Sequence, residues 1–281
     1  MAFCDWSSDV CSSDLTDPEK PFARLTPELV LDAVEGLGLV ADGRLMALNS
    51  YENRVYWVGI EAGSRAARDP RAVPHAVVAK FYRASRWSDA QIREEHEFAL
   101  ELAAAELSVA APLVFEGQTL HQREGYRFTL FECWPGGAPE LDAPDHRAML
   151  GRTLGRLHRV GARRAFRARP SIVDWQHGER ARRRVLEMGI VPEPLDARYA
   201  EASAALVSAI RSRSASFAQA RMQRIHGDCH LGNILWNANG PLYVDFDDCL
   251  MGPVVQDLWM FCSGSSEQQQ AEWTDVLDGY E

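Results

Sequence analysis

The sequence lacks several features that would place it in a common functional class. It has no GxGxxG phosphate loop and no CxxC pair, and no apolar run approaches the ~20 residues that a membrane-spanning helix needs. It also lacks a basic excess, because the formal net charge of its 281 residues is -10. Nucleic-acid backbones select basic surfaces, so we expect no nucleic-acid partner and no membrane anchorage.

Cysteine is scarce as well. Six cysteines form no dense framework of the kind that cross-links small secreted domains. The N-terminus has neither a basic region nor an apolar block, unlike a signal peptide. Hydrophobic residues make up 46% of the chain, enough for a substantial core in one large domain or two lobes. We expect a cytoplasmic, monomeric protein with reduced thiols.

The expected domain organisation follows from changes in residue composition and pattern along the chain. Residues 1–15 repeat Ser-Ser-Asp without an amphipathic period, and we expect them to be a non-native or disordered leader. The sequence Trp-Pro-Gly-Gly, starting at Trp134, breaks the pattern sharply. We therefore expect a nucleotide-binding lobe over residues 16–134 and a catalytic lobe over residues 135–281, with its last helix ending uncapped.

Hydrophobic periodicity predicts an α+β fold that becomes largely helical after this break. β-branched and aromatic residues indicate antiparallel strands first, and apolar residues at helical spacing dominate later. The expected strands lie within residues 48–63, 75–83, 113–115, 119–122 and 126–132. The first expected helix follows the cap Thr26 and covers residues 27–36. Further helices are expected over residues 88–106, 145–160, 194–220 and 266–281.

The segment HGDCHLGN, residues 226–233, carries the strongest chemical signal. Phosphoryl transfer needs a carboxylate that accepts the nucleophile's proton and hard oxygen ligands for Mg²⁺. Asp228 and Asn233 can face one point from this loop, although a turn rich in Asp, Asn and Gly would alone be the commoner explanation. An apolar strand, a hairpin turn and the sequence DFDD follow, so the hairpin should return Asp245 close to Asn233. The pattern indicates a base at Asp228 and magnesium ligands at Asn233 and Asp245.

A zinc site made by His226, Cys229 and His230 is a weaker hypothesis. These residues are too close together, and no second cluster supplies a fourth ligand at the usual spacing. We expect the two histidines to brace the loop by hydrogen bonds. Asp257 follows Gly-Pro-Val-Val-Gln, and we expect it to anchor the loop by accepting backbone N–H bonds or to serve as a helix N-terminal acid.

A nucleotide site is expected from the first lobe. Lys80 ends the apolar run VVAK, where a buried ammonium needs a partner, although an edge-strand lysine with a solvated head is the ordinary alternative. Glu95 on the next helix is the preferred partner, with Glu94 second. Ser50, in LNSYENRVY, replaces a glycine-rich loop and could cradle phosphate with neighbouring amides, unless this segment is a plain hairpin tip.

Together, the motifs HGDCHxGNILW, VDFDD, GPxxQDLWM, LNSYENRVY and KFYR…EEHxFAL resemble the bacterial stress response kinase A family from about residue 22 to the end. That resemblance implies a two-lobed protein-kinase-like fold of the aminoglycoside-phosphotransferase type and a serine/threonine protein kinase that uses ATP and Mg²⁺. It implies Asp228 as proton acceptor, Asn233 and Asp245 as magnesium ligands, and Ser50 at the ATP site. It also implies that the family's chain continues past Glu281.

Two other functions stay open. The same fold serves small-molecule kinases that act on an aminoglycoside, choline or homoserine, and a pseudokinase would bind nucleotide without catalysis. The intact Asp228, Asn233 and Asp245 disfavour the pseudokinase. A run of arginines is read first as a solvated helix face and second as a docking surface for an acidic protein substrate. The run comprises Arg163, Arg164, Arg167, Arg169, Arg180, Arg182, Arg183 and Arg184.

Overall fold

The computed structural model describes residues 20–64, 75–172, 175–217, 220–262 and 265–281. The chain forms two compact units. The first comprises the residues up to Pro139 together with Ile234–Asp247, and the second comprises Glu140–Asn233 and Asp248–Glu281. The expected leader, residues 1–15, lies outside the described residues. The expected lobes over 16–134 and 135–281 stay a prediction, and the first compact unit takes Ile234–Asp247 as well.

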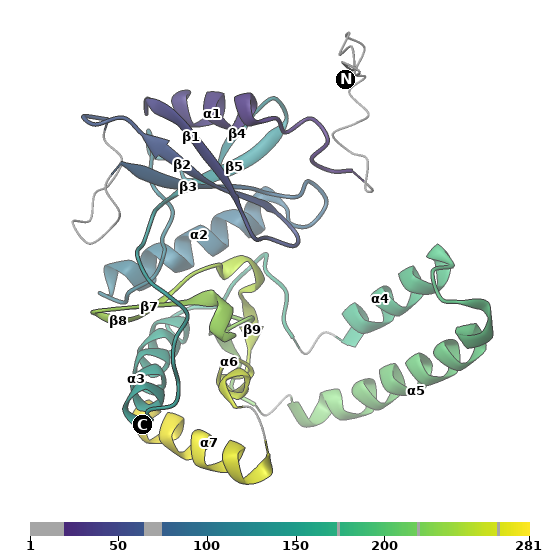
Figure 1. Ribbon diagram of the computed structural model, residues 1–281. Coiled ribbons are helices and arrows are strands. Elements are labelled where there is room, and N and C mark those ends of the chain that lie inside the picture. The colour runs from purple at the N-terminus through teal and green to yellow at the C-terminus, as the bar shows by residue number, and fades with distance from the viewer. Residues whose placement is uncertain (1–19, 65–74, 173–174, 218–219, 263–264) are drawn as a thin grey trace. The chain divides into compact units, whose positions relative to one another are not determined.

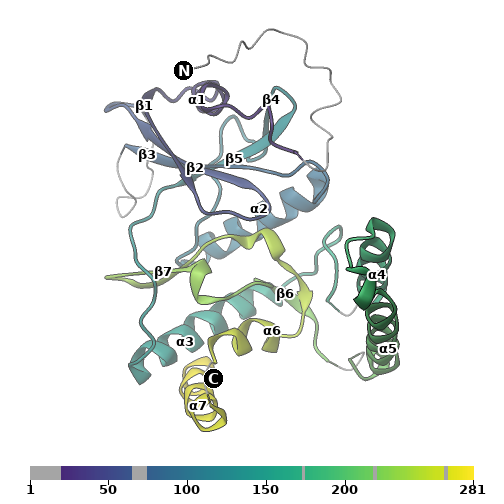
Figure 2. The ribbon, with the colours of Figure 1, turned by 45° about the vertical axis from the view of Figure 1, so that its right-hand side comes forward.

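The first unit is built on a five-stranded antiparallel sheet with strand order β1-β2-β3-β5-β4. Helix α1 covers one face and α2 the other (Figures 1 and 2). The antiparallel sheet with a helix that we expected is confirmed. The elements are α1 (Pro27–Glu35), β1 (Ala41–Leu48), β2 (Arg54–Ile60), β3 (Ala76–Phe81), α2 (Asp89–Ala104), β4 (His121–Arg123) and β5 (Tyr126–Glu132).

Local sequence signals explain both helix starts. Thr26 caps α1 through its hydroxyl, which accepts from the Leu29 amide, and proline follows at the first helical position. Ser88 and Gln91 form a reciprocal capping box at the start of α2. Buried residues of α1 pack against the strands in one core cluster, so burial orients this helix. The cluster includes Val30, Val34, Val58, Ile60, Val77, Phe81, Phe128 and Leu130.

Two strand predictions differ from the structure. Residues 113–115 form no strand and make only isolated bridges, Pro112 to Phe131 and Phe115 to Gln118. The Leu113 amide donates to the Leu130 carbonyl at 2.7 Å, so the segment lies beside β5 but pairs with it only locally. The strand expected over 119–122 begins only at His121, and β1 was not predicted as a separate strand.

A hairpin from the later part of the chain belongs to the first unit. Strands β7 (Ile234–Asn237) and β8 (Gly240–Tyr243) pair antiparallel, with Ile234 opposite Tyr243. Tyr243 bridges Val109, and Trp236 bridges Gly137, so the hairpin is bonded to the segment between α2 and β4 and to the segment after β5. These bonds place the residues that follow β8 in the same unit as Lys80.

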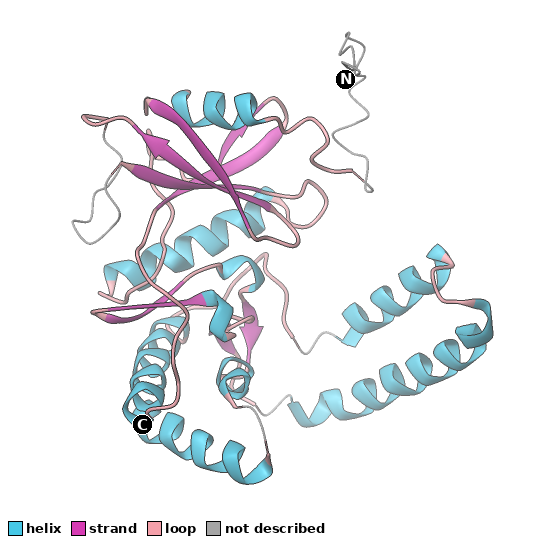
Figure 3. Ribbon diagram, viewed as in Figure 1, coloured by secondary structure: helices cyan, strands magenta, loops and turns pink. Residues whose placement is uncertain are grey.

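The second unit is mainly helical, as expected, with one small pair of strands (Figure 3). Helices α4 and α5 lie alongside each other in both ribbon views (Figures 1 and 2). No described helix is long and apolar enough to cross a membrane. The elements are α3 (Pro144–Gly161), α4 (Trp175–Met188), α5 (Glu193–Phe217), β6 (Gln223–Ile225), β9 (Leu250–Gly252), α6 (Val255–Leu258) and α7 (Ser266–Tyr280), with β6 paired to β9.

The arginine run divides into exposed and buried members. Arg180, Arg183 and Arg184 on α4 are exposed, which agrees with a solvated helix face. Arg169 is 5% exposed and donates to the Cys249 carbonyl at 3.2 Å, so this arginine is a structural residue. The run therefore does not act as one surface.

Candidate active site

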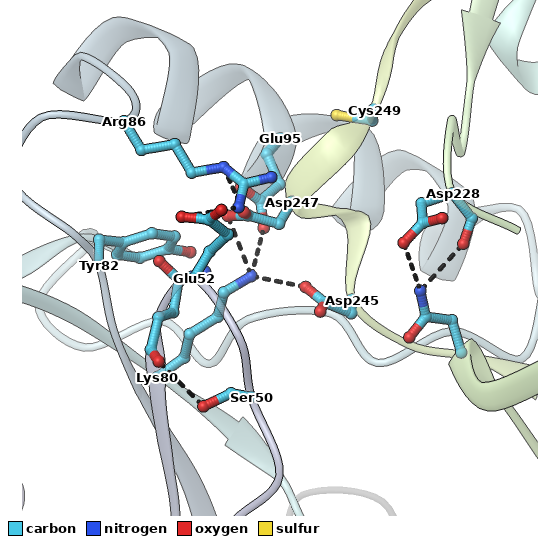
Figure 4. Close-up of polar contacts among 12 residues, drawn as sticks. Ser50, Glu52, Lys80, Tyr82, Arg86, Glu95, Asp228, Asp245, Asp247 and Cys249 are labelled. Atoms are coloured by element: carbon cyan, nitrogen blue, oxygen red, sulfur yellow. Dashed lines mark hydrogen bonds and ion pairs between the residues drawn. The ribbon is translucent and has the colours of Figure 1, made fainter. Parts of the chain in front are cut away.

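Lys80 lies at the centre of an ion-pair cluster in the first unit. It is on β3, between β2 and β5, and its side chain is 5% exposed. Its Nζ lies 2.8 Å from Asp245 Oδ1, 3.2 Å from Asp247 Oδ1 and 3.5 Å from Glu95 Oε1 (Figure 4). The predicted pairing with Glu95 is confirmed, and the alternative of a solvated edge-strand lysine is wrong.

The cluster keeps Lys80 charged despite burial. Burial is the largest influence and would by itself lower the pKa of Lys80. The carboxylates of Asp245, Asp247 and Glu95 together outweigh burial and hold the pKa well above its ordinary value. Arg86 adds a second cation beside these carboxylates, because its Nε lies 3.2 Å from Asp247 Oδ2.

Asp245 and Asp247 reach Lys80 from the turn after β8. Asp245 has φ +55°, a left-handed conformation that Asp tolerates better than most residues, and its side chain is 51% exposed. Phe246 between them is buried and meets Phe98 of α2 edge-on, with ring centroids 5.9 Å apart. The apolar anchor at Phe246 therefore fixes the acids on either side. Asp247 was missed in the sequence analysis, although the DFDD motif contained it.

The loop between β1 and β2 is held by its own polar residues. The Ser50 hydroxyl donates to the Asn53 carbonyl at 2.9 Å. The Asn53 side-chain oxygen accepts from the Arg83 amide at 3.1 Å. Glu52 Oε2 lies 3.1 Å from Arg83 Nη1. It also lies 3.7 Å from Arg86 Nη1, and Figure 4 labels both Glu52 and Arg86. A glycine-free loop is thus ordered by side chains, and Ser50 lies in it as part of a turn.

Asp228 and Asn233 come together within the second unit. The Asn233 side-chain amide donates to the Asp228 carbonyl at 2.9 Å and to Asp228 Oδ2 at 3.3 Å. Asn233 ends η2 (Leu231–Asn233), and this short 3₁₀ turn brings its amide back to Asp228. The Asp228 side chain is 39% exposed, so its carboxylate is accessible from solvent. Both bonds use the side-chain nitrogen of Asn233, and its side-chain oxygen is a hard oxygen donor of the kind that Mg²⁺ prefers.

Asp257 holds the backbone of this loop. It is fully buried, and its Oδ2 and Oδ1 accept from the backbone amides of His226 and Gly227, each at 2.8 Å. Its Oδ2 also lies 2.9 Å from His158 Nε2 on α3. Gly227 has φ +87°, which favours glycine in the tight turn before Asp228. The expected anchoring role of Asp257 is confirmed.

The zinc hypothesis gains no support from the loop. Burial, then the charges of Asp257 and Asp228, raise the pKa of the Cys229 thiol well above its ordinary value, whereas a zinc ligand must be a thiolate. In the part of the chain that the structure describes, no three His, Cys, Asp or Glu side chains form a metal-type group. His230 instead accepts from the Gly232 amide through Nδ1 at 2.9 Å, which confirms its bracing role.

Known proteins resemble this chain along nearly its whole length. A serine/threonine protein kinase RdoA of Salmonella typhimurium is 41% identical over 95% of this chain and 77% of its own. Stress response kinase A of Escherichia coli K12 is 38% identical over 92% of this chain and 75% of its own. These are relatives of the chain, and their identities lie well above those of the solved structures that resemble it.

Solved structures share the fold at lower identity. An amicoumacin kinase, hAmiN, in complex with AMP-PNP, Ca²⁺ and Ami superposes with a TM-score of 0.71 at 19% identity, over 94% of this chain and 80% of its own. A spectinomycin phosphotransferase, APH(9)-Ia, gives 0.59 at 14% identity, over 90% and 79%. The profile of the phosphotransferase enzyme family matches residues 45–281. The two-unit α+β fold is therefore the kinase-like fold of these proteins, and the chain belongs to the phosphotransferase enzyme family.

Proposed function

We propose that the chain transfers the terminal phosphoryl group of ATP to serine or threonine hydroxyls of protein substrates, in a magnesium-dependent reaction that serves a stress response. One observation carries the choice of acceptor. The chain is 38–41% identical, over more than nine-tenths of its length, to relatives named serine/threonine protein kinase and stress response kinase. The small-molecule kinases that share the fold are 19% identical or less.

Each site residue has a role in this proposal. Asp228 accepts the proton of the acceptor hydroxyl while the hydroxyl oxygen attacks the terminal phosphorus of ATP. The bond between that phosphorus and the bridging oxygen breaks, and ADP leaves with this oxygen. Lys80, kept protonated by its carboxylates, binds the nucleotide phosphates, and Glu95 orients it. The loop that contains Ser50 presents its hydroxyl and amides to the phosphates.

Asn233 and Asp245 would hold the magnesium ion. Carboxylate and amide oxygens suit its preference for hard ligands, and the half-exposed carboxylate of Asp245 is accessible to it. The bound ion would neutralise phosphate charge. Asp245 therefore has a catalytic role in the proposal, because it would position both groups that contact the phosphates, Lys80 and the ion.

The decisive substitution is Asp228→Asn. A general base contributes roughly 10²–10⁴-fold to rate, so we expect phosphotransfer to fall by about that factor while ATP affinity is retained. The measurement is transfer of labelled phosphate from ATP to a generic basic protein and to the enzyme itself, followed by phosphoamino-acid analysis. Label on serine or threonine in the wild type, lost in Asp228→Asn, supports the proposal. A variant as active as the wild type contradicts the role of Asp228.

The alternative acceptor is a small hydroxyl compound such as an aminoglycoside, choline or homoserine. The observation that favours it is the shared fold with an amicoumacin kinase and a spectinomycin phosphotransferase. A panel of these compounds under the same assay distinguishes the two: transfer to a small molecule without any phosphoprotein rejects the protein-kinase proposal. A wild type that binds ATP without any transfer indicates a pseudokinase.

A further inference from the structure

Arg86 joins the loop before β2 to the cluster around Lys80. It lies between β3 and α2, in a turn where its amide bonds the Arg83 carbonyl at 3.3 Å. Its Nε lies 3.2 Å from Asp247 Oδ2, and its Nη1 lies 3.7 Å from Glu52 Oε2. Figure 4 shows the guanidinium between these two carboxylates. A single side chain therefore contacts an acid of the loop and an acid that contacts Lys80.

Charge balance explains why this position needs a cation. The side chain of Asp247 is 4% exposed, and a buried carboxylate is costly unless it is paired. One of its oxygens faces Lys80 at 3.2 Å and the other faces Arg86 at the same distance. Lys80 already serves Asp245 and Glu95. A second cation beside Asp247 thus weakens the competition among the carboxylates for Lys80.

We propose that Arg86 is a positioning residue that fastens the loop of residues 49–53 to Asp247 and thereby keeps Lys80 available to the nucleotide phosphates. The inference rests on the proposed function, because it takes ATP as the ligand of Lys80. Without Arg86, Asp247 loses a cation 3.2 Å away and draws more strongly on Lys80. The loop loses one of the two arginines that contact Glu52.

The chemistry of arginine fits the role better than that of lysine. A guanidinium presents several N–H groups in a rigid fork and can serve two carboxylates from different sides, whereas an ammonium is a single point charge. Arg86→Lys therefore keeps the charge near Asp247 but not the reach to Glu52. The substitution separates the two parts of the proposal. Compared with Arg86→Ala, Arg86→Lys should recover part of the ATP affinity that depends on Lys80, but it should not restore the order of the loop.

The test compares full-length wild type, Arg86→Ala, Arg86→Lys and the control Arg93→Ala. Arg93 forms a 3.8 Å i,i+4 pair with Asp89 on α2 and is half exposed. We measure binding of a fluorescent ATP analogue, KM for ATP and kcat separately, and hydrogen exchange of residues 48–55 without nucleotide. For Arg86→Ala we expect Kd and KM to rise roughly tenfold, the size of one charge-assisted contact, with a smaller change in kcat. Exchange in the loop should accelerate, and Arg93→Ala should match the wild type.

Glu52→Gln provides a second variant that leaves Asp247 and Arg86 in place. It should accelerate exchange in residues 48–55 without affecting β3 and β5. Wild-type affinity and loop exchange in Arg86→Ala would overturn the proposal. Faster exchange throughout the sheet in both Arg86→Ala and Glu52→Gln would also overturn it, because that result indicates a general structural role. Failure of the proposed function is distinguishable: a wild type that binds no ATP, or that binds ATP without transferring phosphate to protein, contradicts the proposed function, whereas the exchange arm, run without nucleotide, still reports on the loop.

Discussion

At the residue scale, two neighbouring glutamates on α2 differ in burial, and Glu95 contacts Lys80. Glu95 is 2% exposed and lies 3.5 Å from Lys80, whereas Glu94, the next residue on α2, is less buried. Glu95→Gln removes one of three anions that hold the ammonium in place. We expect ATP binding to weaken several-fold, since a buried ion pair loses one partner, while Glu94→Gln stays close to wild type. Titration with a fluorescent ATP analogue compares them.

The two glutamates serve as matched controls for one another. A damaging Glu94→Gln beside a silent Glu95→Gln would show that the pair seen in the structure does not orient Lys80 for nucleotide. Thermal unfolding of both variants, recorded without ligand, separates a loss of affinity from a loss of fold.

The residues found from sequence and those missed differ in how far along the chain their partners lie. Glu95 was predictable because a strand followed by a helix places Lys80 and a helical acid fifteen positions apart on facing surfaces. Asp257 was expected to anchor the loop of residues 226–233 from its place in the motif GPxxQDLWM, although it lies 31 residues after His226. Arg86 and Asp247 were not predicted, because a contact between segments more than a hundred residues apart leaves no local periodicity or spacing.

At the element scale, helices α3 and α7 approach so closely that glycine is required. A Cβ on Gly151 would overlap the Val276 carbonyl oxygen, and one on Gly155 would lie 2.8 Å from the Tyr280 carbonyl oxygen. The same helices are joined by His158 and the Tyr280 hydroxyl at 2.8 Å. The close backbone contact, together with this bond, fixes α3, whose His158 in turn contacts Asp257.

Gly151→Ala should therefore destabilise the second unit. We expect a loss of roughly 1–3 kcal/mol, because the new methyl group meets backbone that cannot rotate away. Gly178→Ala in α4 is the control, since its nearest heavy atom is a Val207 methyl at 3.9 Å. There alanine should stabilise by about 0.5–1 kcal/mol through helix propensity. Urea unfolding compares the midpoints, and equal effects at both positions would show that the α3–α7 contact is not tight in solution.

Element boundaries show the same division between local and long-range information. Helices α1 and α2 begin within one residue of their expected starts, and α3, which has no side-chain cap, was predicted equally closely from its apolar spacing. Residues 113–115 read as a strand because they are apolar. Whether an apolar segment pairs along its length or only through an isolated bridge depends on the neighbouring strand, here at Leu130 and Phe131.

At the scale of the whole molecule, the division into two units runs between residues that the proposed chemistry needs together. Lys80 and Asp245 belong to the first unit, and Asp228 and Asn233 to the second. The hairpin β7–β8 belongs to the first unit but directly follows Asn233 in the chain, so the two proposed magnesium ligands are connected through a short covalent path. Under the proposed function, Lys80 of the first unit binds the nucleotide phosphates, and Asp228 of the second unit serves as the base.

The proposed roles of Lys80, Asn233 and Asp228 predict which variants ATP and Mg²⁺ will stabilise against thermal unfolding. A ligand at 100 times its Kd stabilises the folded state by about 2.7 kcal/mol, which raises Tm by roughly 5–10 °C if both units melt together. ATP with Mg²⁺ should produce this shift in the wild type and in Asp228→Asn, because the proposal gives Asp228 no part in binding the phosphates or the ion. Lys80→Ala should lose most of the shift in Tm. Asn233→Ala should lose the part of the shift that Mg²⁺ adds, and with ATP alone it should match the wild type. A full shift in Lys80→Ala would place the nucleotide elsewhere, and a loss in Asp228→Asn would show that this carboxylate binds ligand rather than acting only as a base.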